Sequence, residues 1–224
     1  MIEEEKKKII ESLIPLFEKA GRICLELRIQ GLKKEIKDDS TPVTNGDIEV
    51  NNLITAEIKK ITPEVPIVSE EASANKANIN LKNFWLIDPI DGTYDYINNR
   101  DEFTINAGLI INNKPEAGII FAPAKKRLFY SYHQDKSFEI SNNKKKILDC
   151  KKISKKGEIK AVSYSNELKP QIKDWHKKFN VTEHIKMKSS LKFCVIASGE
   201  FDLYIAEPRA CEWDIAAGHA ILRH

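Results

Sequence analysis

The chain has 224 residues, with 36 Lys and Arg against 33 Asp and Glu, which leaves a formal net charge of +3. With 42% hydrophobic and 31% charged residues, the composition is that of a globular protein with a sizeable core, and it excludes a disordered or collagen-like chain. Lysine runs alternate with acidic residues instead of forming one basic stripe, so we expect no nucleic-acid polymer as a partner.

The sequence holds no apolar run of the ~20 residues that span a bilayer. Its N-terminal MIEEEKKKII has no hydrophobic segment followed by a cleavage site. We therefore expect a cytoplasmic protein without a transmembrane segment, and peripheral association with a membrane stays open. The four cysteines form no CxxC pair and the five histidines show no ligand spacing, which argues against disulfides and structural zinc.

Two helices are predicted first, over 7–32 and 47–61, because apolar residues recur there at helical spacing. A polar turn at 37–40 separates them. Short apolar strands are expected in VPIVSEE and NFWLIDPID, followed by strands over 104–111 and 118–121. The Lys- and Asn-rich stretch 125–160 is interpreted as strands at the exposed edge of the same sheet.

The second half begins with a strand in AVSYS, continues with a polar helix over 168–179, and closes with a compact segment from Ser189 onward. We place a lobe boundary near Lys144. It divides the chain into an N-terminal lobe of helices and sheet, residues 1–144, and a C-terminal α/β lobe, residues 145–224.

Acidic residues stand where the apolar strands end. In WLIDPIDGT, Asp88 and Asp91 flank Pro89, which interrupts a regular strand. Like charges this close repel unless a cation neutralises them, and oxygen ligands prefer Mg²⁺ or Mn²⁺ over zinc. Acids that could complete such a site are Glu70 and Glu71 after VPIVS, Asp47 after TPVTNG, and Asp214 in CEWDIAAGH.

Each of these acids also has a plainer interpretation. Asp47 and Asp214 stand at predicted helix starts, where carboxylates commonly serve as caps. Glu70 and Glu71 alone would be a solvated loop, and the DGT that begins at Asp91 would be a turn. Only the joint pattern favours a metal site.

Gly92 and Thr93 follow the acidic pair and could expose backbone N–H groups at the start of a short helix, which is a suitable place for an anion. Carboxylates, a metal and a phosphate cradle together predict metal-assisted phosphoester hydrolysis. The sequence contains no Walker A or kinase-type GxGxxG pattern, so nucleotide-driven phosphoryl transfer is disfavoured.

The motifs TPVTNGD, IVSEE, WLIDPIDGT and WDIAAGHA, in that order, resemble the signatures of the lithium-sensitive, Mg²⁺-dependent phosphatase superfamily that includes the inositol monophosphatases. SSLKFC, GEFDLY and Asp95 look like the bacterial 3'(2'),5'-bisphosphate nucleotidases, which remove the 3'-phosphate from adenosine 3',5'-bisphosphate to give AMP. The resemblance implies a layered α/β/α/β sandwich of the inositol monophosphatase type, as a monomer or homodimer, with the metal site between two lobes and most ligands in residues 1–144.

The resemblance also implies two or three Mg²⁺ ions per site, with Mn²⁺ as a possible substitute. The implied metal ligands are Glu70, Asp88 and the backbone carbonyl of Ile90 for the first ion, Asp88, Asp91 and Asp214 for the second, and Glu70 for a third. The implied catalytic residues are Asp47, Glu70 and Thr93, with Thr93 hydrogen-bonded to Asp47 and helping to deprotonate the attacking water. The implied substrate contacts are Asp91, Gly92, Thr93, Ser190, Lys192 and Asp214. Lys192 would be a point charge on the second phosphate or, alternatively, a surface lysine.

The chain departs from the family pattern in three places. Gly46 stands where Ala is usual, the stretch 125–146 lacks a glycine-rich turn, and the chain ends at His224 where relatives usually continue with a further strand. We therefore expect an altered hairpin and a last helix that is partly uncovered.

Two alternatives within this family remain open: an inositol monophosphatase or related sugar phosphatase, and an inactive homologue that binds a metal or nucleotide. A third alternative is an α/β domain whose acids are caps and surface groups. That domain would show no dependence of its stability on Mg²⁺.

Overall fold

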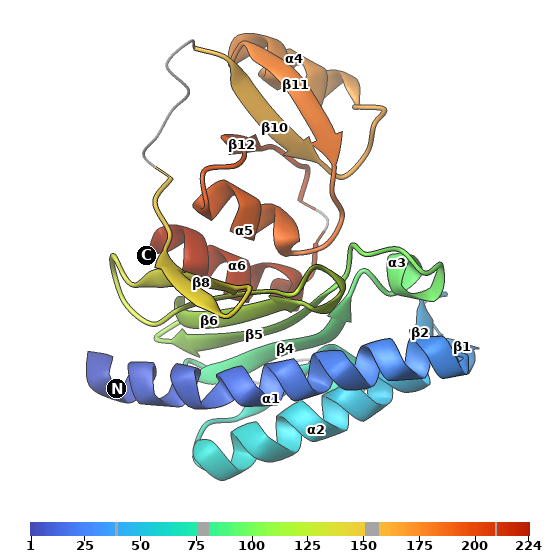
Figure 1. Cartoon of the computed structure of the whole chain (residues 1–224), viewed down its shortest axis with the longest axis vertical. Helices are drawn as coiled ribbons and strands as arrows, with labels where there is room; N and C mark the ends of the chain where they lie inside the picture. The colour runs from blue at the N-terminus through green and yellow to red at the C-terminus, as the bar shows by residue number, and fades with distance from the viewer. Residues whose placement is uncertain (39, 76–80, 151–156, 209) are drawn as a thin grey trace.

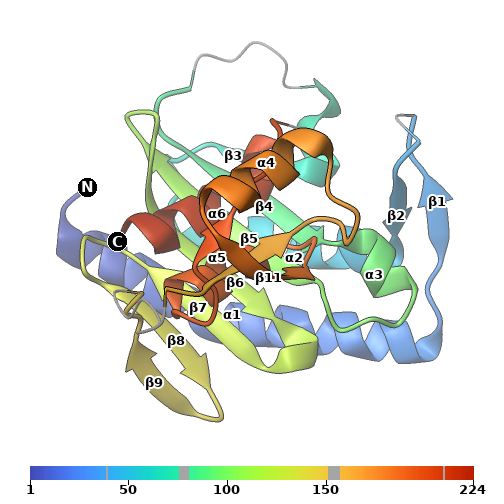
Figure 2. The ribbon, with the colours of Figure 1, turned by 90° about the horizontal axis from the view of Figure 1, so that it is seen from above.

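The computed structural model describes residues 1–38, 40–75, 81–150, 157–208 and 210–224, which stack in layers (Figure 1). Helices α1 (Glu3–Gln30) and α2 (Asn45–Ile61) form the lowest layer, and a seven-stranded sheet lies on them. Helices α5 (Leu191–Ala197) and α6 (Glu212–Arg223) cover the other face of this sheet, below a three-stranded sheet. The layered α/β expectation is confirmed, and α4 (Pro170–Lys178) adds an outermost helix above the smaller sheet (Figure 2).

The large sheet has the strand order β3-β4-β5-β6-β7-β8-β9 and is antiparallel except for the β3–β4 pair. Its strands are β3 (Ile67–Ser69), β4 (Phe84–Asp91), β5 (Thr104–Ile111), β6 (Lys114–Ala122), β7 (Arg127–Ser131), β8 (Ser137–Ser141) and β9 (Lys144–Ile147). The strands expected in the first half are therefore present, and the sheet extends past Lys144.

The smaller sheet is parallel, in the order β11-β10-β12, and consists of β10 (Ile159–Ser163), β11 (Val181–Lys186) and β12 (Leu203–Tyr204). The prediction that the whole stretch 125–160 lies at the edge of one sheet is wrong at its end, because β10 pairs only in this second sheet. Residues 151–156 of that stretch lie outside the described residues.

Asparagine pairs make the tight turns of the large sheet. Asn112 and Asn113 connect β5 to β6 with φ of 51° and 60°, and Asn142 and Asn143 connect β8 to β9 with φ of 51° and 57°. Asn tolerates this left-handed backbone, which two-residue hairpin turns require. The stretch 125–146 thus forms regular hairpins without a glycine-rich turn.

A second hairpin separates the first two helices. Strands β1 (Lys34–Ile36) and β2 (Pro42–Thr44) pair antiparallel around the predicted polar turn at 37–40. The sequence analysis missed these strands because all three residues of β1 are exposed, and so no alternating apolar pattern marks them.

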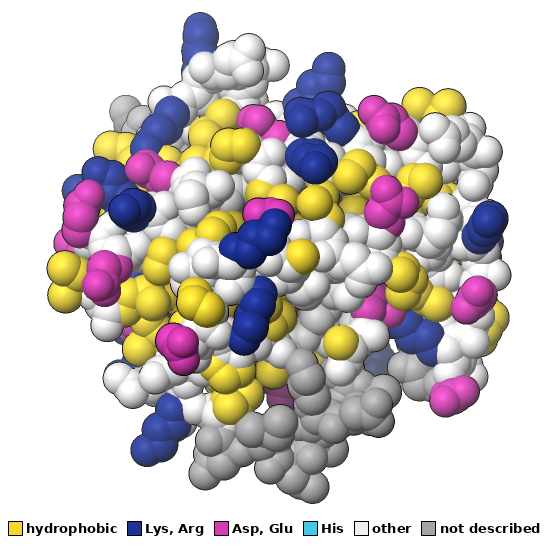
Figure 3. Space-filling view, turned by 90° about the horizontal axis from the view of Figure 1, so that it is seen from below, with side chains coloured by type: hydrophobic (Ala, Val, Ile, Leu, Met, Phe, Trp, Pro, Cys, Tyr) yellow, Lys and Arg dark blue, Asp and Glu magenta, His cyan; other side chains and the backbone are white. Residues whose placement is uncertain are grey.

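The main hydrophobic core lies between the lower helices and the large sheet. Ile10, Leu13 and Phe17 of α1 are fully buried, as are Ile54 and Ile58 of α2. On the outer face seen from below, Lys and Arg side chains are interspersed with Asp and Glu, as the sequence predicted (Figure 3). Even α1, at 28 residues, is not apolar enough to cross a membrane, and the same holds for the other helices of the described ranges.

Helix α6 lies unusually close to the other face of the sheet. A Cβ at Gly108 of β5 would come within 2.7 Å of the Ala216 Cβ, and one at Gly118 of β6 within 2.6 Å of the Ala217 carbonyl oxygen. Small residues on both sides permit this approach, and Ala216, Ala217 and Ile221 are buried. The close packing holds the first turn of α6, which contains Asp214, against the central strands.

Candidate active site

A β-bulge brings the two carboxylates of β4 to one face of the sheet. Asp88 pairs with Asn106 of β5 and Asp91 pairs with Thr104, so three steps along β4 correspond to two along β5. On a regular strand, side chains two residues apart point to the same face of the sheet. Asp88 and Asp91 are three residues apart, and the extra residue that the bulge inserts into β4 lets their side chains share a face. Pro89 lies within this irregularity and has no N–H to donate to the ladder. The sequence predicted that Pro89 interrupts the regular strand, and this interruption brings the side chains of Asp88 and Asp91 to the same face of the sheet.

Asp214 joins this pair from the first turn of α6. One carboxylate oxygen from each of Asp88, Asp91 and Asp214 lies within 4.8 Å of the other two. Asp88 is 1% exposed, and its Oδ1 has no hydrogen-bond partner among the described residues. Asp214 also caps α6, since its Oδ2 accepts a hydrogen bond from the Cys211 N–H at 2.9 Å. Asp214 is therefore a helix cap, and its place in the cluster is compatible with the metal-ligand interpretation.

The electrostatics of this cluster favour a cation. Burial raises the pKa of Asp88 well above its ordinary value, and the charges of Asp91, Glu70, Asp214 and Asp47 raise it further. Burial and the charge of Asp91 likewise raise the pKa of Asp214 to about 6. Carboxylates that repel one another in a buried place are neutralised by protons or by a bound metal ion. Because the donors are all oxygens, the residues fit a hard divalent cation.

Asp47 lies beside this cluster and is 1% exposed. Its Oδ2 accepts hydrogen bonds from the Thr44 N–H at 2.7 Å and the Thr44 hydroxyl at 2.6 Å, which forms the capping box of α2. Its Oδ1 lies 3.3 Å from the Thr93 hydroxyl, which is also 3.0 Å from the Ile90 carbonyl oxygen. The predicted hydrogen bond between Thr93 and Asp47 is thus present, and Asp47 both caps α2 and contacts Thr93.

Gly92 turns the chain from β4 into the short helix α3 (Thr93–Ile97). Its φ of 92° and ψ of 36° lie in the left-handed region that glycine adopts without strain. The expected short helix after the acidic pair is therefore present. Asp95, within α3, is 4% exposed and forms an ion pair with Arg100 at 3.0 Å.

Glu70 begins the 3₁₀ helix η1 (Glu70–Asn75), and the sequence analysis missed its partner. The Lys37 ammonium lies 3.0 Å from Glu70 Oε1 and 2.8 Å from Glu71 Oε1. Lys37 stands at the turn of the β1–β2 hairpin, more than thirty residues earlier in the chain. Nothing in a polar turn distinguishes this lysine from its neighbours, so only the folded structure reveals the pair.

Ser190 contacts the acidic cluster directly. Its backbone N–H and its hydroxyl both lie within hydrogen-bond distance of Asp91 Oδ2. The hydroxyl also lies 3.1 Å from the Asn106 amide nitrogen and 2.8 Å from the Asp214 carbonyl oxygen. Asn106 was absent from the predicted site; the one sequence signal for it is that it is a polar residue inside the apolar run 104–111.

Lys192 is 5% exposed, and its ammonium donates to the carbonyl oxygens of Lys188 and Ser189 at 3.0 and 3.1 Å. Within the described ranges it has no carboxylate partner. The positive charge of Lys192 offsets part of the rise in the pKa of Asp214 that burial and Asp91 cause. The side chain borders a cavity of about 680 Å³ beside α6, whose other lining residues are Phe193, Tyr204, Ala206, Glu207, Pro208, Ala210 and Ile215.

The site combines three convergent carboxylates, of which Asp88 is buried, a threonine hydrogen-bonded to an aspartate, a left-handed glycine turn and the Lys192 ammonium. This combination is that of a metal-dependent phosphatase. Comparison with protein-family models gives the same result. The chain belongs to the inositol monophosphatase family, whose model matches residues 5–224.

Among characterised proteins, the chain is 32% identical over 219 residues to the 3'(2'),5'-bisphosphate nucleotidase CysQ of Buchnera aphidicola, covering 96% of this chain and 82% of that protein. It is 31% identical over 186 residues to CysQ of Escherichia coli K12, covering 83% and 74%. The crystal structure of CysQ from Bacteroides thetaiotaomicron superposes with a TM-score of 0.73 at 26% identity, covering 96% and 85%. The Thermotoga maritima inositol monophosphatase TM1415 shares the fold, with a TM-score of 0.75 at 22% identity and coverage of 95% and 81%.

Proposed function

We propose that this protein is a Mg²⁺-dependent phosphomonoesterase that hydrolyses the 3'-phosphate of adenosine 3',5'-bisphosphate to AMP and phosphate. The supporting observation is a pairing of two features: three convergent carboxylates, and a buried ammonium without a carboxylate partner in the described structure, on the edge of a neighbouring cavity. The first suits metals at a scissile phosphate, and the second suits another anionic group on the same substrate. The CysQ relatives are named as bisphosphate nucleotidases.

Three of the proposed metal ligands are the carboxylates of the acidic cluster, and Glu70, which pairs with Lys37 in this structure, and the Ile90 carbonyl would complete the set. Glu70, Asp88 and the Ile90 carbonyl would hold one Mg²⁺, and Asp88 with Asp91 and Asp214 a second. Glu70 would also contribute to a third, weaker site, and Mn²⁺ could replace Mg²⁺ at these oxygen ligands. When bound, these ions lower the pKa of the attacking water and stabilise negative charge on the leaving oxygen.

The chain's own residues supply orientation. The Thr93 hydroxyl lies between Asp47 Oδ1 and the Ile90 carbonyl, so it is held where it can orient a water for in-line attack, with Asp47 able to accept a proton. The backbone N–H groups of Gly92 and Thr93 would hold the scissile phosphate. Lys192 would bind the 5'-phosphate, while Ser190 fixes Asp91 and contacts the substrate from the same turn.

The decisive experiment measures phosphate release from adenosine 3',5'-bisphosphate, from 3'-AMP and from inositol 1-phosphate, with Mg²⁺ and after chelation. We expect Mg²⁺-dependent release from the bisphosphate with the lowest KM. Replacing Lys192 with Gln should raise the KM for the bisphosphate and leave that for 3'-AMP unchanged. Release chiefly from inositol 1-phosphate would instead assign an inositol or sugar phosphatase, and no release from a folded protein would assign an inactive homologue.

The proposal also covers where the enzyme acts, its oligomeric state and which lobe supplies which site residues. The enzyme would act in the cytoplasm on a small phosphorylated nucleotide, as a monomer or a homodimer. Residues 1–144 would supply most of the metal ligands, and residues 145–224 would supply Ser190, Lys192 and Asp214. Gel filtration with light scattering would decide between the two oligomeric states.

A further inference from the structure

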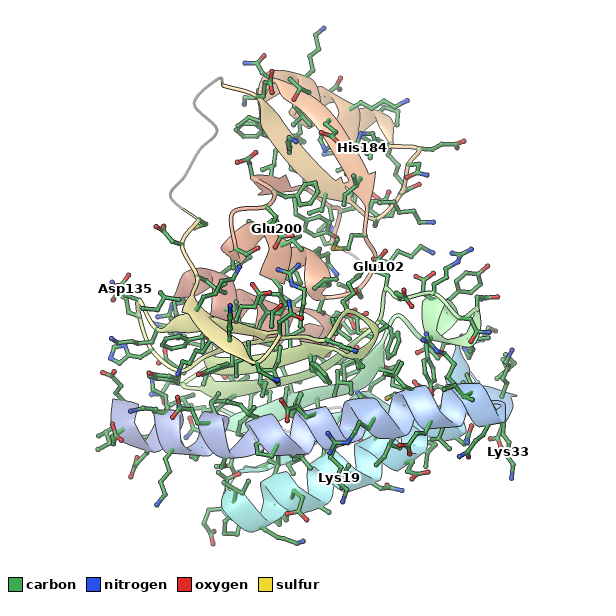
Figure 4. All side chains as sticks on the ribbon, in the orientation of Figure 1. Lys19, Lys33, Glu102, Asp135, His184 and Glu200 are labelled. Atoms are coloured by element: carbon green, nitrogen blue, oxygen red, sulfur yellow. The ribbon has the colours of Figure 1, made fainter. Side chains whose placement is uncertain are left out.

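Glu102 lies where the two parts of the molecule meet at the active site, and the proposed mechanism gives it no role. It belongs to the loop between α3 and β5, and Figure 4 shows its side chain where this loop approaches the segment that leads into α5. Its Oε1 accepts hydrogen bonds from the backbone N–H groups of Lys188 and, at 3.3 Å, of Ser189.

The segment 187–190 connects β11 to α5, and each of its four N–H groups has an acceptor. Met187 donates to the Ser163 carbonyl of β10 at 2.8 Å. Lys188 and Ser189 donate to Glu102, and Ser190 donates to Asp91. Three of these four N–H groups therefore donate to two carboxylate oxygens, Glu102 Oε1 on the loop before β5 and Asp91 Oδ2 at the end of β4. Such charge-assisted hydrogen bonds are stronger than bonds between neutral groups.

One peptide unit joins Glu102 to Lys192. Its N–H, that of Ser189, donates to Glu102 Oε1 at 3.3 Å, while its carbonyl, that of Lys188, accepts from the Lys192 ammonium at 3.0 Å. The second carbonyl that accepts from Lys192, that of Ser189, belongs to the next peptide unit, whose N–H donates from Ser190 to Asp91. A peptide unit is planar and rigid, so fixing its N–H side fixes the direction of its carbonyl. The position of the Lys192 charge thus depends on Glu102 through the first unit and on Asp91 through the second.

The backbone of Glu102 also contacts the proposed phosphate cradle. A Cβ at Gly92 would come within 2.9 Å of the Glu102 carbonyl oxygen, so the two residues are in close contact. Glu102 therefore contacts Gly92 of the proposed phosphate cradle with its backbone, and the turn that holds Lys192 with its side chain. Burial raises the pKa of its carboxyl group, and the hydrogen bonds from Lys188 and Ser189 lower it.

We propose that Glu102 is a positioning residue that sets the distance between the site of phosphate hydrolysis and the Lys192 ammonium, and thereby selects substrates carrying a second phosphate. This inference rests on the proposed function for its substrate. Its structural part, that Glu102 orders the 187–190 turn, stands independently of that function.

The test compares Glu102→Ala with Glu102→Gln, whose amide oxygen can still accept both hydrogen bonds. Asp101→Ala is the matched control, because its carboxylate belongs to the same loop but is 65% exposed, 3.8 Å from Arg28. For Glu102→Ala we expect the KM for adenosine 3',5'-bisphosphate to rise about tenfold, as for the loss of one strong hydrogen bond. The KM for 3'-AMP and both kcat values should change less than about threefold, because the metal ligands stay in place.

Amide hydrogen exchange gives a readout that needs no activity. In Glu102→Ala the amides of Lys188 and Ser189 should exchange faster than in the wild type, while Glu102→Gln and Asp101→Ala should keep their protection. If Glu102→Ala does not fold, Glu102→Asp withdraws the same carboxylate by one methylene and should show the same effects more weakly.

Equal KM changes for the two substrates, or a Glu102→Gln variant as impaired as Glu102→Ala, would overturn the positioning role. Unchanged exchange in the 187–190 turn would overturn it as well. If the wild-type protein does not hydrolyse the nucleotide, the proposed function fails, and the exchange measurement still decides whether Glu102 orders the turn.

Discussion

Replacing Asp88 with Asn should stabilise the metal-free protein and abolish its response to Mg²⁺. In the wild type, Asp88 is 1% exposed, and one of its carboxylate oxygens lies within 4.8 Å of oxygens of Asp91 and Asp214. At an effective dielectric constant of about 20, one such pair of full charges costs about 3.5 kcal/mol. Because burial and these neighbours raise the pKa of Asp88, partial protonation already relieves some of the repulsion.

We therefore expect the metal-free Asp88→Asn variant to be more stable than the wild type by about 2 kcal/mol, which for a chain of this length raises Tm by roughly 4–8 °C. Adding Mg²⁺ at about 100 times its Kd should stabilise the wild type by about 2.7 kcal/mol, or roughly 5–11 °C. The variant should show little of this shift and should lose turnover by about 10²–10⁴-fold.

The assay is thermal unfolding in EDTA and then across a Mg²⁺ titration, with phosphate release measured in parallel. Asp95→Asn is the matched control, since Asp95 is buried but pairs with Arg100 outside the carboxylate cluster. Our reasoning would be refuted if Asp88→Asn were less stable than the wild type in EDTA. An unaltered Mg²⁺ shift in the variant would refute the assignment of Asp88 as a ligand.

Three further changes test the surroundings of the cluster. A Cβ at Gly46 would lie 2.6 Å from the Tyr96 hydroxyl and 2.9 Å from its ring Cε1, so Gly46→Ala should cost about 1–3 kcal/mol in chemical denaturation. Adding Tyr96→Phe should cost less in this variant than in the wild type, because it removes one of the clashing atoms together with the hydrogen bond to the Cys24 carbonyl. Ser190→Ala should weaken Mg²⁺ binding about 10–100-fold in calorimetric titration, because its hydroxyl contacts Asp91 Oδ2. The pKa of Asp214 is raised to about 6, so its contribution to stability is present at low pH and is lost as the pH rises from about 4 through about 6. In EDTA, the Tm of Asp214→Asn should therefore exceed that of the wild type by a margin that grows over this range.

Each of these three has an outcome that contradicts it. Additive costs of Gly46→Ala and Tyr96→Phe would show that the methyl group and the hydroxyl do not compete for the same space. Unchanged Mg²⁺ affinity with a raised substrate KM in Ser190→Ala would mean that Ser190 acts on the substrate alone. A Tm difference that is constant with pH would show that Asp214 titrates normally in the metal-free protein.

Much of the fold near the motifs follows from local patterns in the sequence. The helical spacing of apolar residues predicts α2 to within two residues at its start, and its end before Pro63 is correct. Strands β4 and β5 are predicted in the same way, since both are nearly continuous apolar runs. Burial is periodic along α2 and continuous along β4 and β5, so the sequence retains a record of it in both cases. The hairpin strands β1 and β2 have three residues each, and all of β1 is exposed, so they leave no such record.

The acids of the site could be chosen from the sequence because each follows an apolar strand or begins a helix, and because together they match a family pattern. Their arrangement needed the tertiary structure. Asp214 reaches Asp88 across more than 120 residues of chain only because small residues allow α6 to lie close on β5 and β6. The order of strands in a sheet and the approach of a helix to it depend on packing between distant segments, which no local pattern encodes.

The site residues themselves could be predicted from the sequence, whereas the residues that contact them could not. Carboxylates at strand ends are visible in the sequence, and the sequence by itself therefore indicates the metal site and its chemistry. Lys37 beside Glu70, Asn106 beside Ser190, and Glu102 beneath the 187–190 turn were decided only by the fold. These contacts join polar side chains on loops and strand ends that are far apart in the chain, where each residue type is common and its partner is set by geometry alone.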